Sequence, residues 1–346
     1  MTDKDTKIPE SIREQKHILR FGENGEFRVL VLSDTHGFPP VPCAETIAAV
    51  NLLIEREKPD LLLFCGDNIL GCETEEQLRG CIGALAAYPE EHHIPWAHVF
   101  GNHDDECSKK GGRRLQTLHR SVQQKIYESY PYCVSKAGPE NIPGSGNYVL
   151  PVYAADKSRT DPVFAVWGLD SHADVYDSPL SGQAAILKNT MYQGESGATG
   201  AYIPFAQIRW YFSTSEELEA FAGHRVPGLM AFHIPLEEFY EVALNPEETS
   251  MTGEKRESVC ASPFNSGLFA AMMERGDIKA VCCGHDHVND YAGTFCGICL
   301  AYVSHVGYET YHNESMMGGR VFVIREDAPE KIETYMSYAK EPYRRG

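Results

Sequence analysis

The residues best suited to chemistry in this sequence are two histidines, His285 and His287, separated by one residue. They follow Gly284 and an apolar run over 278–283, which predicts a buried strand with two imidazole groups at its end. The glycine would allow the backbone to turn sharply there. Closely spaced imidazoles are common ligands of transition-metal ions, although an isolated pair can also be a plain surface feature. A metal site therefore requires partners of the same kind elsewhere in the chain.

Acidic, amide and imidazole side chains follow four other apolar runs that we predict to be strands. Catalytic groups of parallel α/β sheets gather at the carboxyl ends of the strands, so we expect these side chains to lie close together. The side chains, each with the run that it follows, are Asp34 and His36 (27–33), Asp67 (60–65), Asn102, His103 and Asp104 (95–100) and His233 (228–232).

Helical periodicity over 43–57 and 74–87 alternates with the first three of these strands, and this alternation is typical of a parallel α/β core. We predict one domain over 27–340 with loop insertions, preceded by a polar N-terminal extension over 1–26. The loops 104–146, 177–200 and 245–266 are expected to decide the substrate. Further predicted helices are 115–130, 205–221 and 267–274, and further strands are 147–153, 163–169, 298–303, 320–324 and 331–336.

Composition limits the classes of partner. The 346-residue chain carries a formal net charge of -18, which disfavours nucleic acid and anionic membrane surfaces as partners. No run approaches the roughly 20 apolar residues of a membrane span, and 1–26 lacks the apolar stretch of a signal peptide, so we expect a cytoplasmic protein. The 11 cysteines are interpreted as free thiols, and Cys296 and Cys299 as residues around a glycine turn.

The five metal-type blocks occur in one order along the chain, and together they resemble the calcineurin-like metallophosphoesterase superfamily. Within this superfamily, the residues that flank the blocks are similar to those of the purple-acid-phosphatase-related group of plants and fungi. The resemblance covers roughly residues 27 to 325 and implies a four-layer α/β/β/α sandwich. The phrases that carry it are Lys58-Pro59-Asp60-Leu61, Gly66-Asp67-Asn68-Ile69, Ile94-Pro95-Trp96-Ala97, Phe232-His233-Ile234-Pro235-Leu236 and Gly284-His285-Asp286-His287-Val288-Asn289-Asp290.

The resemblance implies two divalent transition-metal ions, with Mn, Fe and Zn all compatible with the residues. A phosphate ester needs its charge offset and a water ionised near neutral pH, and two cations about 4 Å apart can do both. Asp67 is the natural bridging carboxylate. By resemblance, one ion would be held by Asp34, His36 and His287, and the other by Asn102, His233 and His285.

Three further residues beside these ligands also have predicted roles. The resemblance makes His103 the general acid toward the leaving group, with Asp104 orienting or tuning its imidazole. Asp286, between two ligands, is expected to face away from the metals as support. Purple acid phosphatases carry an iron-binding tyrosine three residues after the bridging aspartate, and here that position is Leu70. The ferric site and its colour are therefore not expected.

The predicted function is hydrolysis of a phosphate monoester on a small molecule or a phosphoprotein. A phosphodiesterase, for cyclic nucleotides or other diesters, and a non-catalytic metal-binding interaction protein remain alternatives. The presence of His103 argues against the last of these, because a scaffold has no use for a proton donor. His172 could reach the substrate or be an ordinary loop residue. Arg113, Arg114 and Arg120 could contact phosphate or form a solvated helix face.

Overall fold

The computed structural model describes residues 8–13, 15–106, 108–110, 113–115, 120–173, 202–262 and 264–340. The predicted loop over 177–200 lies outside them. The strands are β1 (Leu19–Arg20), β2 (Glu26–Leu32), β3 (Leu61–Cys65), β4 (Trp96–Val99), β5 (Ser108–Lys110), β6 (Arg113–Leu115), β7 (Tyr148–Tyr153), β8 (Pro162–Gly168), β9 (Gly228–Ala231), β10 (Ile278–Cys283), β11 (Ala292–Phe295), β12 (Ile298–Tyr302), β13 (Gly318–Arg325) and β14 (Glu333–Tyr338). The helices are α1 (Glu10–Arg13), α2 (Ala44–Glu57), α3 (Glu75–Glu91), α4 (Arg120–Ser129), α6 (Phe205–Ala222), α7 (Phe239–Leu244) and α8 (Leu268–Arg275).

Two large sheets form the centre of the molecule. One has five strands in the order β14-β13-β2-β3-β4, and the other has seven in the order β1-β7-β8-β9-β10-β12-β11. The strands β2, β3 and β4 run parallel to one another, as do β8, β9, β10 and β12. Parallel strands bring their carboxyl ends to one edge, and the candidate metal ligands follow those ends.

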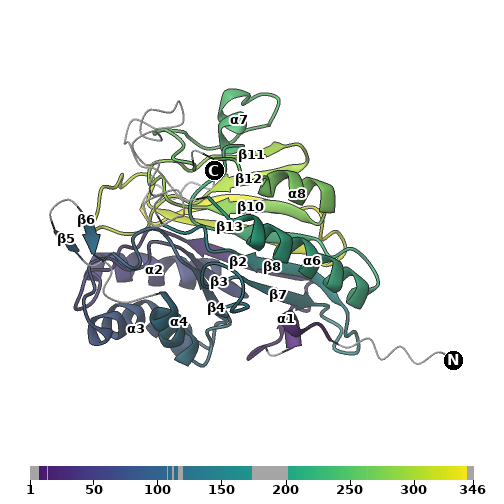
Figure 1. Cartoon of the computed structure of the whole chain (residues 1–346), viewed down its shortest axis with the longest axis horizontal. Helices are drawn as coiled ribbons and strands as arrows, with labels where there is room; N and C mark the ends of the chain where they lie inside the picture. The colour runs from purple at the N-terminus through teal and green to yellow at the C-terminus, as the bar shows by residue number, and fades with distance from the viewer. Residues whose placement is uncertain are drawn as a thin grey trace.

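The side chains of each central strand alternate between two cores. In β2, Val29 and Val31 belong to the core between the sheets, whereas Leu30 and Leu32 pack against the helices α2, α3 and α4. The seven-stranded sheet packs α6, α7 and α8 against its other face. Figure 1 shows these layers, with α2, α3 and α4 outside one sheet and α6 and α8 outside the other. The predicted α/β/β/α sandwich is confirmed, and burial on both faces explains why these strands are apolar throughout.

The structure differs from several local predictions. Residues 19–21 of the predicted polar extension belong to the folded core, because β1 pairs with β7 and both Leu19 and Phe21 are buried. Leu115, predicted as the start of a helix, lies in β6, and the helix α4 begins at Arg120. The short elements β11 and α7 were not predicted. Cys296 and Gly297 form the turn between β11 and β12, which confirms their interpretation as a glycine turn. Among the described residues, no helix is both long and apolar enough to cross a membrane.

Candidate metal centre

The two sheets together bring all the predicted ligands to one place. Asp34 and His36 follow β2, Asp67 follows β3 and Asn102 follows β4, so one sheet supplies four of them. His233 follows β9, and His285 and His287 follow β10 of the other sheet. The ligands thus come from the ends of both sheets, with the apolar core between the sheets behind them.

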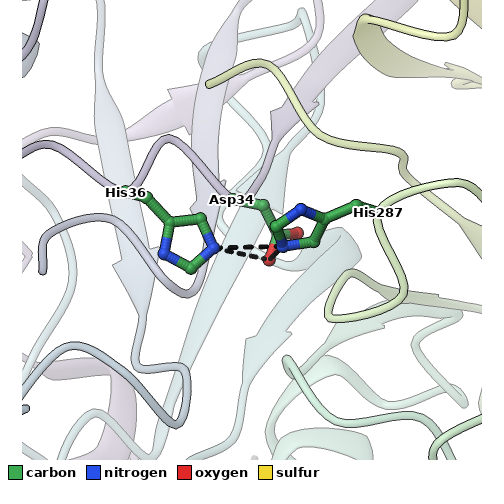
Figure 2. Close-up of side chains that lie close together, drawn as sticks. All are labelled: Asp34, His36 and His287. Atoms are coloured by element: carbon green, nitrogen blue, oxygen red, sulfur yellow. Dashed lines mark hydrogen bonds and ion pairs between the residues drawn. The ribbon is translucent and has the colours of Figure 1, made fainter. Parts of the chain in front are cut away.

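Asp34, His36 and His287 form the first group of converging ligand atoms (Figure 2). The Nε2 atoms of His36 and His287 lie 3.1 Å apart. The Asp34 Oδ1 atom lies 3.2 Å from His287 Nε2 and 3.7 Å from His36 Nε2. All three side chains are buried, so a carboxylate and two imidazoles face one small volume.

Asp67, His233 and His285 form the second group, with ligand atoms that all lie within 4.8 Å of one another. The Asp67 Oδ2 atom is 3.2 Å from His233 Nε2 and 3.7 Å from His36 Nε2 of the first group. Asp67 therefore lies between the two groups, which is the position that a bridging ligand needs. Asp34 Oδ1 is 3.8 Å from His233 Nε2, so this carboxylate also faces both groups.

The ligand atoms themselves fit metal ions. Buried polar atoms in folded proteins are normally hydrogen-bonded. Among the described residues, Asp34 Oδ1, Asn102 Oδ1 and His233 Nε2 are buried without a hydrogen-bond partner. An oxygen and nitrogen set of this kind suits divalent transition metals such as Mn, Fe and Zn. The residues thus fit a dimetal centre, and Asn102 stays the predicted further ligand of the second group.

Contacts behind the metal centre orient two of the imidazoles. His233 Nδ1 lies 2.8 Å from the Cys65 carbonyl oxygen, and His287 Nδ1 lies 2.7 Å from the Tyr311 carbonyl oxygen. When each Nδ1–H donates to its carbonyl, the lone pair of Nε2 is left facing the centre. The Tyr311 ring also stacks on His287 with centroids 4.0 Å apart, so His287 is held in position from two sides.

The electrostatics favour ionised carboxylates. Burial alone would raise the pKa of Asp34, but His287 and His233 outweigh it and hold that pKa well below the ordinary value. His233 likewise keeps the pKa of Asp67 low in spite of burial. Burial opposes protonation of His233, yet Asp67 and Asp34 raise its pKa to about 10. A bound cation would take the place of that proton, so metal uptake should release protons.

Four predicted ligands lie in the left-handed backbone region, with φ of 55° at Asp34, 44° at His36, 50° at Asp67 and 74° at His285. Non-glycine residues rarely adopt this conformation, which costs of order 1–3 kcal/mol each and is concentrated at functional sites. The tight turns at the strand ends are thus made by the ligands themselves.

Gly284 has a different role from the sharp turn that the sequence suggests, because its φ is not positive. A Cβ atom at Gly284 would lie 2.1 Å from Ser33 Oγ and 2.7 Å from Asp34 Oδ2. The glycine therefore permits close approach of β10 to the loop that carries Asp34. Gly101 serves Asp67 in the same way, since a Cβ there would lie 2.2 Å from Asp67 Oδ1.

Gly284→Ala is expected to displace Asp34 and weaken metal uptake, and to destabilise the fold by about 1–3 kcal/mol, the usual effect of overpacking. Metal content and the free energy of unfolding measure the two effects. Gly83→Ala adds the same methyl group within α3, where the nearest atom to the new Cβ would be the Tyr130 hydroxyl at 3.1 Å. This control should keep its metals. Normal metal content in Gly284→Ala would show that the close approach at Gly284 is not needed.

The imidazole of His103 lies at the rim of the centre. Its backbone N–H donates to Asp67 Oδ1 at 2.7 Å, and its ring centroid is 5.5 Å from that of His36. The side chain is 27% exposed, so a substrate can reach it. Its Nδ1 is paired with the Glu106 carboxylate. Glu106 was not predicted. It lies three residues after His103, across a turn closed by the hydrogen bond from the Glu106 N–H to the His103 carbonyl. This spacing could have indicated that the two side chains pair.

The role predicted for Asp104 is wrong. Its carboxylate accepts hydrogen bonds from the backbone N–H groups of Gly101 at 2.6 Å, Asn68 at 2.8 Å, and Asp67 and Ile69 at 3.0 Å. It therefore holds the backbone that carries the bridging ligand, while Glu106 orients His103. The physical reason is that four backbone N–H groups donate to this buried carboxylate, and in the described part of the chain they have no other acceptor.

Three other residues that the sequence analysis singled out, Asp286, His172 and Arg120, contact other residues of the protein. Asp286 accepts hydrogen bonds from the Tyr302 hydroxyl at 2.5 Å and the Cys260 N–H at 3.1 Å, and these contacts are compatible with its predicted role as support. His172 Nε2 lies 2.7 Å from Gln207 Oε1, so its ring contacts another side chain of the protein.

Arg120 is buried and donates to the Gly101 carbonyl at 2.6 Å and to Asp170, so it is neither solvated nor available to phosphate. The side chains of Arg113 and Arg114 lie outside the described part of the chain.

The iron-loaded protein is expected to show no intense visible charge-transfer band, because Leu70 stands where a purple enzyme has its tyrosine ligand. Tyr311 is the described tyrosine that stacks on a ligand, and its hydroxyl lies 3.3 Å from a Glu257 carboxylate oxygen. Absorption spectra of protein with a measured iron content test this expectation. A strong purple colour would identify a phenolate ligand, and Tyr311→Phe would then be the first variant to examine.

The fold and the site define a class of protein. Residues 27–289 match the family model of the calcineurin-like phosphoesterases, and the chain belongs to this family. A solved structure from Danio rerio, described as a dimetal phosphatase, has the same fold, with a TM-score of 0.58 and 12% identity. It covers 91% of this chain and 97% of its own.

Curated relatives place the chain within the family. It is 33% identical over 325 residues to "Probable inactive purple acid phosphatase 14" of Arabidopsis thaliana, covering 85% of this chain and 73% of the relative. "Probable inactive purple acid phosphatase 29" of the same plant is 30% identical, covering 86% and 76%. The Saccharomyces cerevisiae phosphatase DCR2 is 28% identical over an alignment of 295 residues, covering 78% of this chain and 45% of that protein. The predicted resemblance to plant and fungal purple-acid-phosphatase-related proteins is confirmed.

Proposed function

We propose that this protein is a dimetal-dependent phosphomonoesterase. The observation that supports turnover is His103, an accessible imidazole at the rim of two converging ligand groups, with Glu106 on its Nδ1 atom. A protein that only binds metals needs the ligands, but it does not need an oriented proton donor beside them.

Two divalent cations held by Asp34, His36, His287, Asp67, Asn102, His233 and His285 would offset the phosphate charge and activate a water molecule to attack phosphorus. The side chains of the protein supply the proton for the leaving group. The Glu106 carboxylate accepts from Nδ1–H of His103 and orients the ring, so that the protonated imidazole can give its second proton, on Nε2, to the leaving oxygen and return to the neutral ring. The bond between phosphorus and that oxygen breaks, the water oxygen forms the new bond, and the products are an alcohol and inorganic phosphate.

The relatives' names make turnover the point to test, because two plant relatives are named inactive and the yeast relative is named a phosphatase. We further propose a small phosphorylated molecule or a phosphoprotein as substrate and the cytoplasm as location. Because the net charge of -18 repels anions, we expect the cations of the site, and not the overall field of the protein, to attract the phosphorylated substrate.

The experiment compares p-nitrophenyl phosphate with bis(p-nitrophenyl) phosphate on protein reconstituted with Mn²⁺, Fe²⁺ or Zn²⁺. Faster release from the monoester is expected, and a chelated sample should release neither product. Preference for the diester would favour the phosphodiesterase alternative. Release from neither substrate, at two metal ions per chain, would favour the non-catalytic metal-binding alternative.

A further inference from the structure

Two cysteine thiols lie in contact next to the loop that carries the bridging ligand. Cys72 lies five residues after Asp67, and Cys81 lies in the second turn of α3. Their Sγ atoms are 3.7 Å apart, both side chains are buried, and both cysteines are free. The sulfur atoms of a disulfide are about 2.05 Å apart, so an approach of less than about 2 Å would link this pair. Neither thiol has a role in the dimetal centre itself.

The two thiols differ in reactivity. The hydrogen bond between them lowers the pKa of Cys72 and raises the pKa of Cys81. Cys72 is also 7% exposed, whereas Cys81 is 0% exposed. Because the thiolate is the form that oxidants attack, Cys72 should react first with a small oxidant. Cys81 is then in place to attack the oxidised sulfur.

The backbone is held differently on the two sides of Cys72. On the side of α3, Gln77 Oε1 accepts the N–H of Thr74 at 3.2 Å and that of the preceding residue at 2.7 Å, so the chain is fixed to this helix. On the other side lies Gly71, whose φ of 81° is in the left-handed region. Movement of Cys72 toward Cys81 must therefore be taken up at Gly71.

Gly71 connects this movement to the proton donor. Its N–H donates to the Glu106 carbonyl at 2.8 Å, and the Glu106 carboxylate is paired with His103 Nδ1. The loop at Asp67 is held more firmly, because the Asp104 carboxylate accepts the N–H groups of three successive residues, 67–69. A shift at Gly71 should therefore move Glu106 and leave the metals bound.

We propose that Cys72 and Cys81 are a redox modification site, at which a hydroperoxide forms a reversible disulfide that displaces Glu106 from His103. The Cys72 thiolate attacks the hydroperoxide, so that an S–O bond forms, the O–O bond breaks, and the leaving oxygen takes up the proton that Cys72 lost. The Cys81 thiol then attacks this sulfur, the S–S bond forms, and the S–O oxygen leaves as water. Two thiols are oxidised and one hydroperoxide is reduced, and exchange with a free thiol reverses the change.

The disulfide is tested on Zn²⁺-loaded protein treated with hydrogen peroxide, because zinc has no redox chemistry of its own. Mass spectrometry should find a peptide that links Cys72 to Cys81, two hydrogen atoms lighter than the separate pair, and dithiothreitol should release it. Cys72→Ser and Cys81→Ser should not form it. Cys296→Ser, which removes an exposed thiol between β11 and β12, is the matched control and should still form it. Absence of the linked peptide from the wild-type protein would overturn the proposal.

The effect on turnover rests on the proposed function. The oxidised protein should keep its zinc and lose about 10- to 100-fold in kcat/KM on an alkyl phosphate, the order of effect expected when a catalytic group is displaced by about 1 Å. The loss on p-nitrophenyl phosphate should be smaller, and Cys72→Ser should resist peroxide on both substrates. Equal inactivation of Cys72→Ser and wild-type protein would show that oxidation elsewhere is responsible.

Nuclear magnetic resonance of the histidine ring nitrogens reports the Glu106 contact without turnover, with His103→Gln to assign the signal. Oxidation should shift the His103 signal in the wild-type protein and leave it in place in Cys72→Ser. A shifted signal in a protein that cleaves no substrate would support the modification site while the proposed function fails. An unshifted signal in protein that contains the disulfide would overturn the connection to His103, whichever substrates are cleaved.

Discussion

Asparagine in place of Asp67 is expected to weaken uptake of both metal ions. Asp67 Oδ2 lies between His233 Nε2 at 3.2 Å and His36 Nε2 at 3.7 Å, so one charge serves both ligand groups. Asparagine tolerates the left-handed φ of 50° and can still accept the His103 N–H bond through its oxygen. The variant thus removes mainly the charge. Removing a partner behind a ligand already costs roughly 10- to 100-fold in affinity, and losing a bridging charge should cost at least that.

Elemental analysis and melting curves with and without added Mn²⁺ or Zn²⁺ measure this loss. Wild-type protein should bind about two ions per chain and melt at a higher temperature with metal, because ligands of the native state stabilise it. Asp60→Asn is the matched control, since it removes an exposed carboxylate at the opposite end of the same strand. Full occupancy of both sites in Asp67→Asn would show that this carboxylate is not the bridge.

The central strands and the polar residues that follow them could be predicted from one physical pattern, whereas the two-sheet sandwich was implied by the family resemblance. A strand covered on both faces must be apolar throughout, as β3 is, so its limits are visible in the sequence. The polar residues directly after such a strand must then lie at the edge of the sheet. Asp67 after β3 and His233 after β9 follow this rule, although 166 positions separate them in the numbering of the chain.

Partners made by loops are harder to predict. Nothing in the neighbours of Asp104 indicates that its carboxylate would meet the backbone N–H groups of residues 67–69, more than 30 positions earlier. Arg120 was interpreted as one of a basic cluster with its neighbours in sequence. It is instead a buried residue that donates to Asp170 and to the Gly101 carbonyl. β1 escaped prediction because it has only two residues, and its burial depends on β7.

His103→Gln is expected to lose about 10²- to 10⁴-fold in kcat/KM on an alkyl phosphate, the range typical of general acid catalysis. The loss on p-nitrophenyl phosphate should be smaller, because nitrophenolate leaves without a proton. Both metals should remain, since the described ligand groups do not include His103 and its backbone N–H bond to Asp67 is kept. The ratio of wild-type to variant kcat/KM on each substrate, with metal content checked, measures the effect.

Glu106→Gln separates orientation from proton donation. Its side-chain oxygen can still accept from His103 Nδ1, so the tautomer survives while the charge that stabilises the protonated ring is lost. This variant should show a smaller loss than His103→Gln, with the same dependence on the leaving group. Equal losses on both substrates in His103→Gln would instead indicate that the imidazole binds phosphate or stabilises charge in the transition state. Loss of a metal would make His103 a ligand, and the second group would then need a different set of residues.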